Sequence, residues 1–422
     1  MRFSIFSNII LSYKFHDRKF SVAISSDQSR QIKEEIRQEL ITNILPFWIN
    51  QAVDCENGGF YGALSNDLLI DNQAPRSAVL TTRILWTYSA AFRLHKRPEY
   101  LTMAEYAYDY LNRVFVDPDY GGVYWTVDVK GNPLQNHKHS YAQAFAIYGF
   151  AEYYRACHME VALKKAKDIF ELLDQNTHEP LNGGYLEGKG RDWAPMPDLR
   201  LSDKDLACQK SMNTNLHILE AFTNLYRVWP DPKLKQRLTE LINCFLGHII
   251  DPKQHHLQLF FDDDWNSLED TISFGHDIEA SWLLVEAASI LGLPRLEDKV
   301  KSKSIQLAQS VFECGLWSDG SVILEGSDHA FTNTERHWWP AAEGMVGFYN
   351  AYQVSGWEHF AQAAYHCWQF AREKLVDRQY GDWIKVLDND YRPKAGVYKM
   401  GPWECPYHHA RACFEMIDRI SN

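Results

Sequence analysis

Apolar residues recur along this chain at the spacing of helices. After about residue 31 they fall three or four positions apart, as at Ile32, Ile36, Leu40 and Ile44, and such positions share one face of a helix. Segments of this kind continue to the end of the chain. To within ~2–4 residues at each boundary, the pattern predicts twelve helices, over 28–52, 77–95, 98–116, 139–157, 160–177, 211–229, 232–250, 273–291, 295–315, 336–355, 358–376 and 405–421.

The predicted helices alternate between two kinds. Odd-numbered ones carry charge along one face, as between Leu163 and Asp168, whereas even-numbered ones are apolar on nearly all sides, as between Ala142 and Gly149. A helix that is apolar all round is buried. Six buried helices alternating with six amphipathic ones, at a pair period of about 60–75 residues, indicate an inner ring wrapped by an outer ring. We therefore expect an all-α protein, an (α/α)6 barrel of twelve helices.

Short Gly-aromatic segments with strand-like alternation separate the helix pairs. They lie at 58–61, 121–128, 183–187 and 257–261. Residues 127–133 supply the Asp, Gly, Asn and Pro that a tight turn prefers. These segments predict short β-hairpins in the loops at one end of the barrel.

The chain is expected to hold one folded domain. No Gly/Ser-rich linker divides it, so residues 31–422 are predicted to form a single (α/α)6 barrel catalytic domain. Residues 1–30 are predicted to be a nonessential N-terminal extension whose composition permits disorder. Its apolar stretch from Phe3 to Leu11 is followed by charged residues and by no A-x-A cleavage site, which argues against a signal peptide.

Charge and cysteine content narrow the class of partner. The formal net charge is −12 and no long basic run occurs, which argues against a nucleic-acid or anionic-membrane surface. The eight cysteines form no C-x-x-C pair and no disulfide-framework spacing, as expected of reduced thiols in the cytoplasm. No apolar run approaches the ~18 residues of a membrane span. We expect a cytoplasmic monomer or weak homodimer that acts on a small neutral molecule.

Polar and aromatic residues interrupt the apolar pattern near one end of each inner helix. A lone residue of this kind is commonly a satisfied structural side chain. Inner helices separated by antiparallel outer ones run parallel, however, so equivalent positions meet at one rim, and six such breaks favour a shared pocket. The candidates are Arg83, Tyr141, Asn213, His217, His276, Glu279, Trp339, Glu343 and His408, whereas His137, His139, His337 and His409 are taken as structural or supporting residues.

Helical spacing suggests a partner for one histidine. His276 and Glu279 are three apart and share a helix face, so Glu279 could accept a hydrogen bond from the imidazole or from a ligand hydroxyl, and a carboxylate there would favour the imidazolium. A metal site is the alternative, but no H-E-x-x-H or similar motif is present, and no metal is predicted. Trp339 and Trp403 suit the apolar face of a sugar ring.

Seven ordered motifs resemble those of one enzyme family. They are TRILWTYSAAFR around Arg83, YGGVYWTVDVKGNP, YAQAFAIYG from Tyr141, SMNTNLHILEA around His217, GHDIEASWLL around His276, WWPAAEGMVGF, and GPWECPYHHARAC around His408. From about residue 31 onward the chain resembles cellobiose 2-epimerases, within the wider N-acylglucosamine 2-epimerase superfamily. The run at 187–193 departs from the family's usual E-A-F-x-R-D-W pattern.

The resemblance implies an (α/α)6 barrel and cofactor-independent inversion of C2 in the reducing-end glucose of β-1,4-linked disaccharides such as cellobiose and lactose. It implies that His276 and His408 are the catalytic bases. By motif match, Arg83, Glu279 and His217 bind and polarise the reducing-end sugar. Other pocket-lining positions implied by the resemblance are Tyr141, Trp339, Glu343 and Trp403.

The chemistry fits these residue types. The C2 proton becomes acidic only in the open-chain aldehyde, so such an enzyme must open the ring before forming a cis-enediolate. Histidine titrates near neutrality and can serve as base or acid on either face, while Arg83, with His217, could stabilise the enediolate oxygen. Within the same fold, N-acylglucosamine 2-epimerase and a mannose-type aldose–ketose isomerase remain alternatives. A remoter one is an inverting glycosidase, with Glu279 and Glu343 as its carboxylates, and a noncatalytic carbohydrate-binding protein is remoter still.

Overall fold

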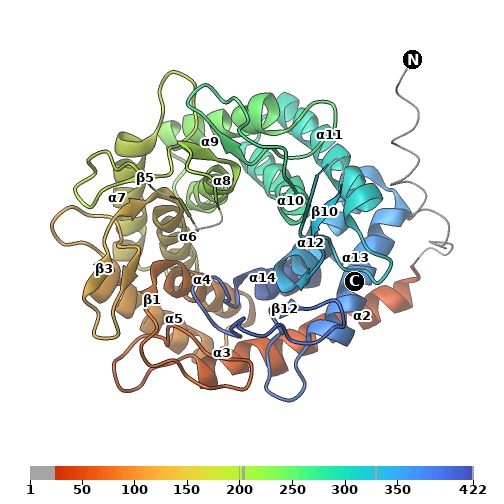
Figure 1. Ribbon diagram of the computed structural model, residues 1–422, viewed down its shortest axis with the longest axis horizontal. Helices are drawn as coiled ribbons and strands as arrows, with labels where there is room; N and C mark the ends of the chain where they lie inside the picture. The colour runs from red at the N-terminus through yellow and green to blue at the C-terminus, as the bar shows by residue number, and fades with distance from the viewer. Residues whose placement is uncertain (1–23, 199, 202–204, 328–329, 421–422) are drawn as a thin grey trace.

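Two concentric rings of helices build the protein (Figure 1). The computed structural model describes residues 24–198, 200–201, 205–327 and 330–420, and in this part of the chain the helices form twelve segments. The inner ring consists of α4 (Ala78–His95), α6 (Ser140–Cys157), α8 (Met212–Tyr226), α10 (Phe274–Leu291), α12 (Trp338–Ser355) and α14 (Tyr407–Arg419).

The outer ring alternates with the inner one along the chain. Five of its six segments include a π-helical turn, where the helix widens by one residue per turn. The segments are α2 (Ser26–Glu39) continued by η1 (Leu40–Ile44) and α3 (Leu45–Gln51), α5 (Pro98–Tyr110) with η2 (Leu111–Phe115), α7 (Glu160–Thr177), α9 (Pro232–Cys244) with η3 (Phe245–Ile249), α11 (Pro294–Ser310) with η4 (Val311–Gly315), and α13 (Glu358–Phe370) with η5 (Ala371–Leu375).

The predicted barrel of twelve helices is confirmed. Each inner helix contacts the next, and α14 contacts α4, which closes the ring. The inner helices are apolar all round because both sides are covered: in α6 every residue from Ser140 to Tyr153 is buried. The first helix begins at Ser26, inside the range assigned to the N-terminal extension, and residues 1–23 of that extension lie outside the described residues.

Short antiparallel pairs of strands tie neighbouring repeats together. In all four predicted hairpin segments a residue bridges back to the end of the preceding outer helix: Val53 to Phe60, Val116 to Val123, His178 to Tyr185, and Ile250 to Leu257. The turn predicted at 127–133 joins β2 to β3, and the Asp128 N–H donates to the Asn132 carbonyl at 2.8 Å. Two further bridges of the same kind, Leu316 to Val322 and Val376 to Trp383, complete the series.

Each two-residue strand that enters an inner helix pairs with a strand of the following repeat. The pairs are β1 (Arg76–Ser77) with β2 (Thr126–Val127), β4 (Lys138–His139) with β5 (Gly188–Lys189), β6 (Lys210–Ser211) with β7 (Phe260–Phe261), β8 (Ile272–Ser273) with β9 (Glu325–Gly326), and β11 (Arg336–His337) with β12 (Val386–Leu387); β3 (Pro133–Gln135) and β10 (Phe331–Asn333) extend the first and fourth.

Buried or partly buried ion pairs repeat at the entrance to five of the inner helices. A cation on the entering segment meets an acid from the turn that follows the preceding outer helix. Because these acids also accept backbone N–H groups of their own turns, the pairs join loop to helix at the rim. The pairs are Arg76–Asp54 at 2.6 Å, Lys138–Asp117 at 2.8 Å, Lys210–Glu179 at 3.4 Å, Arg336–Asp319 at 3.5 Å and Lys399–Asp377 at 2.6 Å, while Ile272 takes the cation's place in the fourth repeat.

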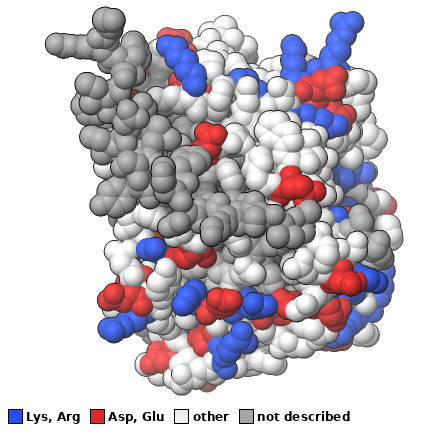
Figure 2. All heavy atoms as spheres, turned by 90° about the vertical axis from the view of Figure 1, so that its right-hand side faces the viewer, with Lys and Arg blue, Asp and Glu red and all other residues white. Residues whose placement is uncertain are grey.

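The outer surface mixes charges of both signs. Figure 2 shows Lys and Arg interspersed with Asp and Glu over the uncovered part of one face. Within the described ranges, no helix combines the length and hydropathy that crossing a bilayer would require.

We expect Asp117→Asn to destabilise the fold by about 3–5 kcal/mol at pH 7, because it leaves Lys138 buried with no full negative charge beside it. Burial acts to raise the pKa of Asp117, but hydrogen bonds from Arg191 and Lys138 hold that pKa well below its usual range. A depressed folded-state pKa gives stability that is present above the unfolded pKa of about 4 and is lost as the pH falls below it. Urea unfolding at several pH values measures both effects. The expectation fails if the variant and the parent differ by less than about 1 kcal/mol at pH 7.

Candidate active site

Arg83 lies near the start of α4 in an aromatic environment. The residue is 2% exposed, and its Nη2 donates to the Tyr141 hydroxyl of α6 at 2.7 Å. Its guanidinium lies over the rings of Phe145 and Tyr407, 4.3 and 4.8 Å from their centroids. These faces replace part of the hydration that the cation loses on burial. The arginine is thus fixed and charged at the rim of the inner ring.

His217 of α8 adjoins this group and belongs to a buried carboxylate network. Its ring lies 5.0 Å from that of Tyr141, and its Nδ1 is 2.9 Å from Glu220. Glu220 also accepts from the Tyr407 hydroxyl and from Arg411. Burial acts to raise the pKa of Glu220, but Arg411 and His217 hold it well below its usual range. This carboxylate is therefore ionised at neutral pH.

Arg411 of α14 joins carboxylates from three inner helices. In addition to Glu220, its Nη2 donates to Glu279 of α10 at 2.7 Å and to Glu343 of α12 at 2.8 Å. All four side chains are at most 2% exposed. A buried carboxylate without a cation or hydrogen bonds is costly. Arg411 therefore sets how these helices can approach one another.

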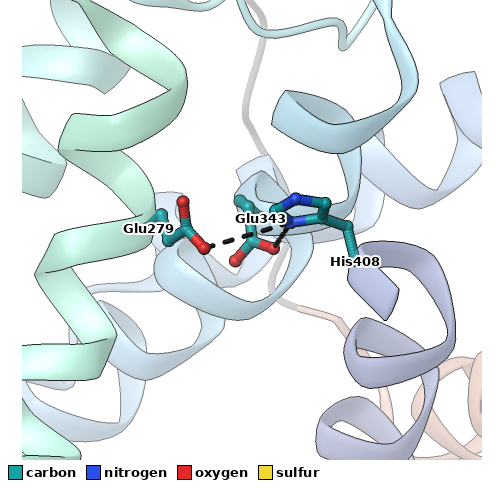
Figure 3. A group of neighbouring side chains, drawn as sticks. All are labelled: Glu279, Glu343 and His408. Atoms are coloured by element: carbon teal, nitrogen blue, oxygen red, sulfur yellow. Dashed lines mark hydrogen bonds and ion pairs between the residues drawn. The ribbon is translucent and has the colours of Figure 1, made fainter. Parts of the chain in front are cut away.

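Glu343 holds His408 in place (Figure 3). The His408 Nδ1 lies 2.7 Å from the Glu343 Oε1 and 3.9 Å from the Glu279 Oε1, and the other Glu343 oxygen accepts from the Trp282 indole at 3.0 Å. Burial raises the pKa of both Glu279 and Glu343; the Glu343 carboxylate adds to the rise at Glu279 and the Glu220 carboxylate to the rise at Glu343, while Arg411 opposes it at both. This favours a proton on the pair at neutral pH.

His276 uses a helix-capping serine as its partner. At the starts of α4 and α8, Ser77 and Ser211 accept the backbone N–H of the residue three positions on. At the equivalent place before α10, the Ser273 hydroxyl instead lies 2.7 Å from the His276 Nδ1. The hydroxyl fixes the imidazole orientation through that nitrogen.

Two expectations about His276 need correction. The structure assigns Glu279 to Arg411 and pairs His276 with Ser273, because a guanidinium from α14 makes a stronger, charge-assisted hydrogen bond across the barrel than an imidazole on the same helix. The imidazolium is also not favoured. Burial, together with His217, lowers the pKa of His276 to about 3, and burial with Arg83 and Arg411 lowers the pKa of His408. These lowered pKa values favour the neutral form of both imidazoles at neutral pH.

One indole connects the two histidines. The Trp339 ring centroid lies 4.8 Å from that of His276 and 5.7 Å from that of His408. Gly275 makes room for it, since a Cβ at that position would lie 2.4 Å from the indole. Trp339 therefore brings imidazoles from α10 and α14 to one place.

The remaining candidates line the surroundings of this group. Trp403 lies in the loop before α14, with its ring 5.7 Å from Tyr141. Asn213 lines a cavity of about 220 Å³ together with His276, and its Oδ1 is buried with no partner. An unpaired amide beside a cavity is suited to a ligand hydroxyl. The structure therefore brings all ten predicted residues to one rim.

The segment that departs from the family pattern is anchored at both ends. Glu187, also on the wall of the 220 Å³ cavity, accepts from the Ser211 N–H at 2.8 Å and from the Thr214 hydroxyl at 2.7 Å. Burial raises its pKa to about 7. At the other end Arg191 binds Asp117 through two hydrogen bonds, of 2.9 and 3.0 Å. The residues between them form β5, so the departure changes a strand next to the pocket rather than the pocket's framework.

Glu279, Glu343 and His408 each offer a ligand atom within 4.8 Å of the others, a spacing that could hold a metal ion. The Arg411 Nη2 already donates to both carboxylates, however, and occupies the side of the group from which a cation would bind these oxygens. The arrangement fits a guanidinium better than a divalent ion.

Sequence reasoning missed Glu220, Ser273, Tyr407 and Arg411. Three of them are polar residues within the inner helices, the same signal that identified the other candidates, and Arg411 lies within the last motif. Ser273 precedes its helix, at the N-cap. Their contacts involve other helices or the helix cap. Spacing along a single helix does not predict such contacts.

Comparison with known proteins shows the family to which the chain belongs. The family model for N-acylglucosamine 2-epimerase (GlcNAc 2-epimerase) matches residues 59–412. A cellobiose 2-epimerase of Bacteroides fragilis is 43% identical over 92% of this chain and 98% of its own length. The N-acylglucosamine 2-epimerase of Rattus norvegicus is 22% identical over 92% of this chain and 91% of its own. The structure of the cellobiose 2-epimerase of Bacillus thermoamylovorans superposes with a TM-score of 0.88 at 39% identity, covering 92% of this chain and all of that one.

We expect Arg411→Met to cost about 3–5 kcal/mol in unfolding free energy, because it leaves the buried carboxylates without their cation. Adding Glu220→Gln should restore part of the loss. The matched control is Arg227→Met, which breaks the partly exposed pair with Glu286 and should cost about 1 kcal/mol or less. Guanidinium unfolding measures all three. Equal costs for the two arginines would show that Arg411 is not the central constraint.

Proposed function

We propose, from the fact that this chain belongs to the N-acylglucosamine 2-epimerase family, that it inverts C2 of the reducing-end glucose of β-1,4-linked disaccharides. Cellobiose would give glucosyl-mannose and lactose would give epilactose. The identity of 43% to a cellobiose 2-epimerase, against 22% to an N-acylglucosamine 2-epimerase, favours the disaccharide over the N-acylated monosaccharide. The observation that carries the proposal is the pair of imidazoles of His276 and His408, both against Trp339.

The reaction needs a base that is uncharged before the substrate binds. Ring opening produces an aldehyde at C1, whose carbonyl makes the C2 proton acidic, so the carbon chemistry proceeds without an added electron sink. The lowered pKa values of His276 and His408 keep both as acceptors. One imidazole removes the C2 proton from one face, and its counterpart returns a proton to the other. The two histidines exchange these roles when the reaction runs in reverse.

The carboxyl pair of Glu279 and Glu343 can supply the proton that the neutral imidazoles lack. Glu279 and Glu343 favour sharing a proton at neutral pH, and the His408 Nδ1 contacts Glu343 directly. The Glu279 Oε2 has no hydrogen-bond partner among the residues that the structure describes and, when protonated, can donate to a sugar oxygen. Proton transfer between His408 and Glu343 can then produce the imidazolium only when a substrate charge stabilises it.

Arg83 stabilises the charge that develops on the substrate. Its guanidinium is fixed by Tyr141 and by the rings around it, so it needs little reorganisation when the C1 oxygen becomes negative in the enediolate. A preorganised donor of this kind is commonly worth about 3 kcal/mol in the transition state. His217 is proposed to support the same oxygen. We assign substrate contacts to Tyr141, Asn213, His217, Glu279, Trp339, Glu343 and Trp403.

Incubation with cellobiose in D2O tests both substrate and mechanism. We expect NMR spectroscopy to show glucosyl-mannose that carries deuterium at C2, because the abstracted proton exchanges with solvent. Parallel incubations with lactose, mannose and N-acetylglucosamine report the preferred class. Product without deuterium at C2 would exclude the enediolate, release of glucose would indicate a glycosidase, and turnover of the monosaccharides alone would exclude the disaccharide assignment.

His276→Ala and His408→Ala should each lower kcat by about 10²–10⁴-fold, the usual contribution of a positioned acid or base. His248→Ala is the control, since this exposed histidine stacks on Trp265 at the outer surface and should leave turnover unchanged. Epimerisation rates and circular dichroism are measured together. A folded His276 or His408 variant with near-parental turnover would contradict the two-histidine assignment.

A further inference from the structure

We propose that Ser310, His256 and Asp277 form a second nucleophilic site, on the outside of the barrel, that attacks small carboxylic esters. The Ser310 Oγ lies 2.9 Å from the His256 Nε2, and the His256 Nδ1 lies 2.6 Å from the Asp277 Oδ2. A hydroxyl, an imidazole and a buried carboxylate in this order are the parts of a serine nucleophile and its base. The site does not depend on the proposed epimerase function.

Three separate parts of the fold supply these residues. Ser310 is the last residue of α11, His256 lies in the turn after η3, and Asp277 lies in the first turn of α10. Asp277 follows His276 directly but faces away from the epimerase residues: its Oδ1 accepts the Leu257 N–H at 2.7 Å, in the same turn as His256. The carboxylate is therefore held by its own backbone contact and orients the imidazole.

The hydrogen bonds select the tautomer that a base requires. Asp277 is fully buried and accepts, so the His256 Nδ1 carries the proton and donates to it. The His256 Nε2 is then left with its lone pair toward the Ser310 hydroxyl. That hydroxyl also lies 3.3 Å from the Gln254 carbonyl, a longer contact than the 2.9 Å to the imidazole. Because its contact is the shorter one, the His256 Nε2 is the acceptor that we assign to the Ser310 hydroxyl proton.

The group is open to a ligand. A cavity of about 470 Å³ is lined by Ser310 and His256 and also by Ile305, Gln306 and Trp357. Trp357 is 49% exposed and, with Ile305, offers an apolar surface for an acyl group. Gln306 lies one turn before Ser310 on the same helix face, and the oxygen of its amide is buried without a partner. Since the two ends of an amide can exchange by rotation, this side chain is the candidate donor to the oxyanion.

The reaction follows from these contacts. The Ser310 oxygen bonds to the ester carbonyl carbon as its proton passes to the His256 Nε2. The tetrahedral adduct then expels the alkoxide, which takes that proton and leaves as an alcohol. Water, deprotonated by the same imidazole, attacks the acyl-serine, and a carboxylic acid leaves with the serine restored. The co-reactants are the ester and water alone. A purely structural role, in which Ser310 only fastens α11 to the preceding turn, would leave the serine inert.

The test is covalent labelling of the full-length protein with a fluorophosphonate, which reacts with activated serines by loss of fluoride. We expect one adduct per chain in the intact mass and its location on Ser310 by peptide mass spectrometry. Ser310→Ala should carry no adduct. His256→Gln should label at least ~100-fold more slowly, because it removes the general base. p-Nitrophenyl acetate should show a matching burst of nitrophenolate.

Ser302→Ala is the matched control, because Ser302 is exposed on the same helix and should not be the labelled residue. This variant should label as fast as the parent, and circular dichroism should show that every variant is folded. An absence of labelling in the parent, an adduct on another residue, or equal rates for His256→Gln and the parent would each overturn the proposal.

Discussion

The Arg411 guanidinium, shared by three buried carboxylates, is the interaction on which the interior of this barrel depends. Glu220, Glu279 and Glu343 come from α8, α10 and α12, and the arginine comes from α14. Four of the six inner helices must therefore keep one rotation and one height relative to each other. Burial raises the pKa of Glu279 and Glu343, neighbouring carboxylates add to the rise, and the one guanidinium opposes it, which favours a proton at the place where His408 is bound. The buried group that constrains the packing thus also affects the protonation of the site.

The repeated fold supplies positions that are structural in some repeats and chemical in others. Ser77 and Ser211 cap their helices, whereas the equivalent Ser273 orients His276. A buried or partly buried ion pair joins loop to helix at the entrance to five inner helices. In the fourth repeat Ile272 takes the cation's place, before the helix that carries His276. Function is built here by small changes at equivalent places on a common framework.

The helices and the grouping of the candidate residues at one rim could be predicted from the sequence because both rest on local signals. The helical period of the apolar residues predicted the twelve segments, and the polar residues that interrupt this period marked the candidate positions in the inner ring. Partners across the barrel could not be found in this way. Spacing placed Glu279 on the face of His276, but the competing donor, Arg411, lies 132 residues further along the chain. The hairpin segments at Val322 and Trp383 were missed because they lack the Gly-Gly pair that marked three of the four predicted segments. The relation between Ser310, His256 and Asp277 is likewise visible only in three dimensions.

The order of helices around the ring has a consequence for biosynthesis. Because α14 closes the circle against α4, the ribosome delivers this wall of the barrel, with His408 and Arg411, only after the other five inner helices. Until then Glu220, Glu279 and Glu343 have no guanidinium, and a nascent chain that compacted around them would bury three uncompensated acids. The growing polypeptide is thereby discouraged from closing early, and a chain interrupted before α14 would have neither a closed ring nor the cation that its buried carboxylates need.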